Sequence, residues 1–151
     1  MFKVQLENIF LNIIFMVFLC ICTVFDIRKK EIPIYMILIG IISSFGVNIW
    51  QIFEGTISVT GVSVSLFPGL FFLLISFCTK EKIGYGDGLI LIVSGLVLGF
   101  YQCFLGLCIS LICSSVFALL LLVLHKARKD SELAFVPFLT IGMGVSFFVW
   151  A

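Results

Sequence analysis

Long apolar runs alternate with short polar segments along the chain. A helix that crosses a membrane needs about 20 predominantly apolar residues, and six runs approach that length. They cover residues 8–25, 33–52, 62–79, 88–103, 104–124 and 133–150. The pattern therefore predicts an all-α, polytopic membrane protein with six transmembrane helices, in a single domain over residues 1–151.

Two of these runs contain local signals that modify the layout. Pro68-Gly69 predicts a kink or a late helix start in the third run, because proline lacks the backbone N–H of a helix interior. The fourth and fifth runs are separated only by the polar pair Tyr101–Gln102. We therefore expect these two helices to form a tight hairpin that turns at Tyr101–Gln102.

The composition supports a membrane location. The chain is 62% hydrophobic and only 11% charged, whereas soluble domains carry about 25% charged residues. So little charge could not cover a soluble domain of 151 residues. The formal net charge of +1 gives no indication of nucleic-acid binding, and no nucleic-acid partner is expected.

Basic residues are confined to alternate connections between the apolar runs. Cytoplasmic loops of membrane proteins are enriched in Lys and Arg. The distribution therefore predicts a protein of the cytoplasmic membrane with both termini extracytoplasmic and three loops in the cytoplasm. Eight of the nine Lys and Arg residues follow this pattern: Arg28, Lys29, Lys30, Lys80, Lys82, Lys126, Arg128 and Lys129.

Two aspartates lie at the predicted cytoplasmic ends of apolar runs. Asp26 ends the first run and Asp87 precedes the fourth, 61 positions later in the chain (26 to 87). Both would have the same membrane depth, so packing the first helix against the fourth would bring them together. Two adjacent carboxylates share one proton at neutral pH. The ionised member can activate a water, and the protonated member can donate to the leaving amine.

Structural roles for the same aspartates stay open at this point. Asp87 follows a glycine at the start of a helix, where an aspartate often caps the helix N-terminus. Asp26 lies close in sequence to Arg28 and Lys29, with which it could form an interfacial ion pair. Against these roles, ionisable residues in membrane segments are commonly functional, and Gly84 and Gly86 would leave room for an extended substrate.

The cysteines and the single histidine do not predict a metal site. No two cysteines form a CxxC pair, and His125 has no cluster of ligands around it. Structural zinc sites require such spaced ligands, so no metal and no cofactor is expected. The cysteines lie within or at the edges of apolar runs and are interpreted as small apolar residues: Cys20, Cys22, Cys78, Cys103, Cys108 and Cys113.

Three patches of sequence resemble the type IV prepilin peptidases, which are GxGD intramembrane aspartic proteases. One is Asp26-x-Arg28 followed by Ile32-Pro33, and another is the GxGD segment at residues 84–87 with Gly88 and Leu89. The third is the Pro-Phe-Leu segment at residues 137–139, followed by Gly142. The resemblance extends over nearly the whole chain.

This resemblance implies a function and a set of site residues. Asp26 and Asp87 would be the catalytic pair of an aspartic endopeptidase whose site faces the cytoplasm. Its substrates would be prepilins, pseudopilins or archaellin-like proteins, with a basic leader, a glycine at the cleavage site and an apolar helix in the membrane lipid. Pro137 would line the substrate site or simply kink the last helix. The residues expected to shape the site are Gly84, Gly86, Gly88, Arg28, Pro33, Pro137 and Phe138.

The sequence departs from the family pattern at three points. Leu89 replaces the lysine of the GxGDxK motif, and Ile34 replaces the asparagine after Ile-Pro. The chain also lacks the two CxxC pairs of the methyltransferase region that many bacterial members carry, so the expected activity is cleavage without methylation. Two other functions remain open: a non-catalytic pilin-binding assembly factor, and a small proton- or cation-coupled transporter.

Overall fold

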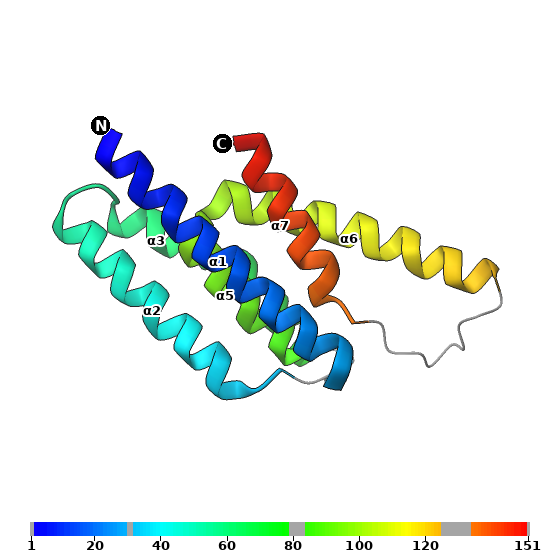
Figure 1. The fold of residues 1–151 in the computed structure, drawn as a ribbon. Helices are drawn as coiled ribbons and strands as arrows, with labels where there is room; N and C mark the ends of the chain where they lie inside the picture. Colours follow the sequence, from blue (N-terminus) through cyan, green and yellow to red (C-terminus); the bar gives the residue numbers. More distant parts are fainter. Residues whose placement is uncertain (1, 30–31, 79–83, 125–133, 151) are drawn as a thin grey trace.

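The computed structural model describes residues 2–29, 32–78, 84–124 and 134–150, and every regular element in these ranges is a helix (Figure 1). The predicted all-α class is therefore confirmed. The segments are α1 (Phe2–Lys29), α2 (Ile34–Phe53), α3 (Val59–Ser65), α4 (Phe67–Cys78), α5 (Tyr85–Leu98), α6 (Phe100–Val123) and α7 (Val136–Trp150).

Several of these helices have the length and composition of membrane spans. The long apolar ones are Phe10–Lys29, Ile34–Phe53, Val59–Cys78 and Phe100–Val123. The apolar helices α5 and α7 have 14 and 15 residues, or about 21–23 Å, against a hydrocarbon core of about 30 Å. The chain is therefore a multi-pass membrane protein. That it has six spans, and that both termini are extracytoplasmic, stay predictions.

Two of the predicted helix boundaries can be compared with the structure. The kink or late start predicted near Pro68 corresponds to a break in the helix: the helical segment already begins at Val59, α3 and α4 are separated at Leu66, and Pro68 lies in the first turn of α4. The turn predicted at Tyr101–Gln102 is wrong, since both residues lie within α6. The break occurs at Gly99, whose φ of 80° is a left-handed conformation that favours glycine. Backbone requirements, rather than side-chain polarity, determine the position of this turn.

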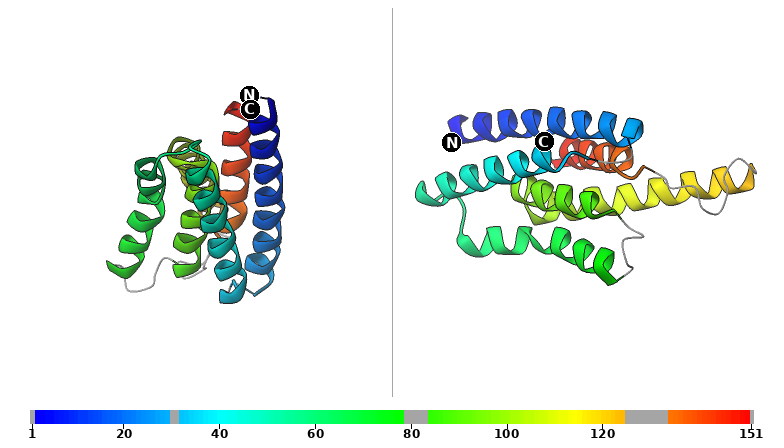
Figure 2. Two further views of the ribbon diagram at one scale, coloured as in Figure 1. Left: turned by 90° about the vertical axis from the view of Figure 1, so that its left-hand side faces the viewer. Right: turned by 90° about the horizontal axis from the view of Figure 1, so that it is seen from below.

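Helix α5 forms the centre of the bundle. It contacts α1, α2, α3, α4 and α6, while α7 packs between α1 and α6. The helices α1 and α7 lie on one side of α5 and α6, and the α3–α4 pair lies on the other (Figure 2). Most of α5 is therefore buried, including Ile90, Leu91, Val93, Leu96 and Leu98.

One end of the bundle gathers segments that are far apart in the sequence. The chain ends, marked N and C in Figure 1, lie at the opposite end. At the end without the termini, the C-terminal end of α1 meets the N-termini of α5 and α7. Arg28 and Lys29 lie at this end, and both are exposed. The other residues used to predict sidedness, and His125, lie outside the described residues: Lys30, Lys80, Lys82, Lys126, Arg128 and Lys129.

Candidate active site

Asp26 lies near the C-terminal end of α1 and is held by the first residue of α7. Its side chain is only 8% exposed, and its Oδ2 accepts a hydrogen bond of 3.1 Å from the backbone N–H of Val136. The N–H groups in the first turn of a helix have no partner within that helix, and a helix N-terminus favours negative charge. The contact therefore orients the Asp26 carboxylate and anchors α7 on α1.

A pair of threonines joins the same two helices one turn further into the bundle. The hydroxyls of Thr23 in α1 and Thr140 in α7 are 2.7 Å apart. Each also lies 2.9 Å from a carbonyl of its own helix, that of Leu19 for Thr23 and that of Val136 for Thr140. The threonine pair supports the Asp26–Val136 contact, because both limit how α7 can move on α1.

Replacing Thr140 by valine should loosen this junction. The change keeps the shape of the side chain but removes the hydrogen bond between the two hydroxyls, which is worth about 0.5–1.5 kcal/mol, while Thr23 keeps its bond to the Leu19 carbonyl. We expect a lower melting temperature in detergent and a several-fold lower rate of substrate cleavage. Thr140→Ser keeps the hydroxyl and is the matched control. Equal stability and activity of Thr140→Val and the wild type would contradict a positioning role for the pair.

Asp87 is the third residue of α5, after the glycine that precedes the helix. Gly84 is the N-cap residue and accepts the Asp87 N–H at 3.1 Å, so the interpretation of Asp87 as the N-cap is wrong. A Cβ atom on Gly84 would lie 3.2 Å from Oδ2 of Asp87. Gly84 therefore leaves the space into which the Asp87 carboxylate folds.

The two aspartates belong to neighbouring helices at the same end of the bundle. The predicted packing of the first helix against the fourth corresponds to the contact between α1 and α5. The carboxylates of Asp26 and Asp87 lie close enough for their charges to interact. Residues separated by 61 positions thus share one electrostatic environment.

The other two glycines in and next to the GxGD segment contact the surrounding protein. A Cβ atom on Gly86 would lie 3.4 Å from Ile32, in the connection between α1 and α2. One on Gly88 would lie 2.8 Å from the Leu73 side chain of α4, so Gly88 allows α4 and α5 to pack closely. Pro33, the N-cap residue of α2, directly follows Ile32. Contacts of any of these residues with substrate stay predictions.

The start of α7 contributes more to this region than the sequence predicted. Pro137 is the second residue of α7, where a backbone N–H has no intrahelical partner, so the predicted kink is wrong. The ring of Phe138 packs on Phe117 of α6, with centroids 5.3 Å apart. Phe135 stacks on Phe72 of α4 at 5.8 Å. The role of the backbone N–H of Val136 in the site was not predicted from the sequence. Pro137 was a usable signal, because proline is common in the first turn of a helix, where backbone N–H groups are free to bind other partners.

The arrangement has the groups needed for acid–base chemistry on a peptide bond. It offers two interacting carboxylates, one fixed by a backbone N–H and one beside an N-cap glycine. Comparison with known proteins gives a match between residues 13–123 and the type IV leader peptidase family. The matched segment includes both aspartates and the GxGD segment. No curated protein and no solved structure matches the chain.

Proposed function

The chain belongs to the type IV leader peptidase family, and we propose that it is an aspartic endopeptidase that removes the leader peptides of type IV prepilin-like proteins. The observation that carries the proposal is the interaction between Asp26 of α1 and Asp87 of α5 at one end of the bundle. The family membership agrees with the resemblance predicted from the sequence motifs.

The proposed reaction uses the two carboxylates and one water. With one proton shared by the pair, the ionised carboxylate removes a proton from the water, whose oxygen attacks the peptide carbonyl carbon. The other carboxylate protonates the leaving nitrogen as the C–N bond breaks. The products are the free leader and a pilin with a new N-terminal amine, and the pair again holds one proton.

The start of α7 supports this chemistry by orienting one member of the pair. The Val136 N–H occupies Oδ2 of Asp26, which leaves the second oxygen for the water or for Asp87. A fixed carboxylate needs less reorganisation during the reaction than a mobile one, and such preorganisation is a major source of catalysis. The segment around Pro137 thereby acquires a role without contacting the scissile bond.

The proposed site faces the cytoplasm. Arg28 and Lys29 lie at the same end of the bundle as the aspartates, and basic residues favour the cytoplasmic side. A substrate with a basic leader in the cytoplasm, a glycine at the cleavage site and an apolar helix in the membrane would place its scissile bond at this depth. Prepilins, pseudopilins and archaellin-like proteins have this arrangement.

Cleavage of a prepilin by the purified protein tests the proposal. The protein is reconstituted in liposomes with a prepilin whose leader ends in glycine, and the mass of the pilin is followed over time. We expect a loss of mass equal to that of the leader. Pilins that bind but keep their full mass, across several such substrates, would indicate a non-catalytic pilin-binding role instead.

A further inference from the structure

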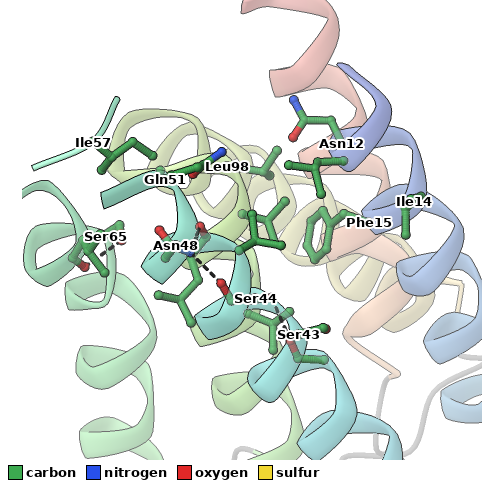
Figure 3. Close-up of a pocket in the computed structure, with 18 of the residues that line it drawn as sticks. Asn12, Ile14, Phe15, Ser43, Ser44, Asn48, Gln51, Ile57, Ser65 and Leu98 are labelled. Carbon is green, nitrogen blue, oxygen red and sulfur yellow. Dashed lines mark hydrogen bonds between the residues drawn. The ribbon is translucent and has the colours of Figure 1, made fainter. Parts of the chain in front are cut away.

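A pocket of about 540 Å³ lies between α1 and α2, away from the two aspartates (Figure 3). These helices follow one another in the chain, yet α1 packs mainly on α7 and α2 mainly on α5. The space between them therefore remains open, with α3, α5 and the start of α6 also contributing to its lining. The described residues that line it include no Asp, Glu, Lys or Arg.

Small residues form the α2 side of this groove. Gly40, Ser43, Ser44 and Val47 recur at the spacing of one helix face and line the pocket. A Cβ atom on Gly40 would lie 2.9 Å from the Phe18 ring of α1. Faces of small residues allow membrane helices to approach closely. Phe18 of α1 covers Gly40 and Ser44 is buried, whereas Ser43 is exposed and leaves part of this face open.

Three polar side chains on the α2 side of the groove already have partners within the protein. Ser43 and Ser44 each donate a hydrogen bond of 2.7 Å to a carbonyl of their own helix. The Asn48 amide donates to the carbonyls of Ser44 and Leu96, which ties α2 to α5. An apolar occupant could therefore cover these donors without leaving them unpaired, a loss that would cost about 1–3 kcal/mol for each group.

The groove lies along the two helices that carry the aspartates. In α1, Phe18 precedes Asp26 by eight residues, and in α5, Val93 follows Asp87 by six. At 1.5 Å per residue these intervals are about 12 and 9 Å. The groove thus begins about two helical turns from the aspartates and extends toward the end of the bundle where α5 ends at Leu98.

We propose that this groove binds one face of the membrane helix of the substrate. The inference rests on the proposed function: a substrate whose scissile bond lies at Asp26 and Asp87 continues as an apolar helix toward the opposite side of the membrane. The groove offers that helix an uncharged wall of small residues and Phe15 and Phe18 of α1. Substrate selection would then depend on the helix as well as on the cleavage site.

Filling the groove should impair the cleavage of substrates that carry the membrane helix. Ser43→Phe adds a large side chain to the groove, whereas Gly46→Phe adds the same side chain where no protein atom lies within 4 Å. Each variant is assayed with a full-length pilin and with a peptide truncated shortly after the scissile bond. We expect the ratio of kcat/KM for pilin over peptide to fall about tenfold for Ser43→Phe alone, through KM.

Photo-crosslinking identifies the occupant directly. A photoreactive phenylalanine analogue placed at Ser43 should crosslink to the pilin helix, and one at Gly46 should crosslink to lipid only. Lipid as the sole product from both positions, or equal ratios for both phenylalanine variants, would overturn the groove proposal. If the wild type cleaves neither substrate, the proposed function fails, and crosslinking from Ser43 still decides whether the groove binds pilin.

Discussion

Replacing either Asp26 or Asp87 by asparagine should reduce prepilin cleavage by roughly 10³-fold or more. A positioned general acid or base contributes about 10²–10⁴-fold, and residues that act as a catalytic unit lose most of their effect when one member is removed. Asparagine has nearly the same shape as aspartate but neither takes a proton from water nor gives one to the leaving amine. The measurement is the single-turnover rate of leader removal.

The same variants separate catalysis from folding. Asp26→Asn keeps a carbonyl oxygen that accepts the Val136 N–H, so its melting temperature should stay close to that of the wild type. Asp26→Ala removes the acceptor as well and should melt earlier, because an unpaired buried N–H costs about 1–3 kcal/mol. A folded Asp26→Asn or Asp87→Asn variant with more than a tenth of the wild-type rate would refute the catalytic assignment.

Replacing Gly142 by leucine should disrupt the contact between α6 and α7. A Cβ atom at this position would overlap Oγ of Ser110 and the carbonyl oxygen of Gly106. The helices have no space for a side chain there, and overpacking of this kind typically costs about 1–3 kcal/mol and sometimes more. Since α7 also carries Val136, its displacement should remove the hydrogen bond to Asp26.

We expect Gly142→Leu to lower both the melting temperature and the yield of active protein. Gly144→Leu is the matched control, because no atom lies within 4 Å of a Cβ atom placed on Gly144. The two substitutions are identical in chemistry and lie two residues apart in α7. Similar melting temperatures and cleavage rates for the two variants would show that the close approach at Gly142 is not required.

The sequence was sufficient to predict which residues lie at the same end of the bundle. Apolar runs of membrane-spanning length and basic residues on alternate connections placed Asp26 and Asp87 at one depth. The contact between α1 and α5 agrees with this. The prediction succeeded because length and hydropathy constrain a membrane helix more strongly than a soluble one, where tertiary packing often overrides local pattern.

Contacts that depend on the backbone could not be predicted in the same way. The turn at Gly99 was assigned to Tyr101–Gln102, because polarity was used where a left-handed residue was the actual requirement. The bond from Val136 to Asp26 joins residues 110 positions apart through a main-chain N–H. Pro137 indicates a helix start at this position, but no side-chain pattern indicates the partner of the N–H. The groove between α1 and α2 depends on which helices do not pack together, and hydropathy carries no such information.

The central claim is that Asp26 and Asp87 act as one catalytic unit, and a double-variant experiment tests it most directly. Rates of prepilin cleavage are compared for Asp26→Asn, Asp87→Asn and the protein with both changes. If the pair shares one proton, each single variant should already be as slow as the double variant, because the effects of such residues are not additive. Cleavage by the double variant at the wild-type rate, or two independent losses that multiply, would contradict the account.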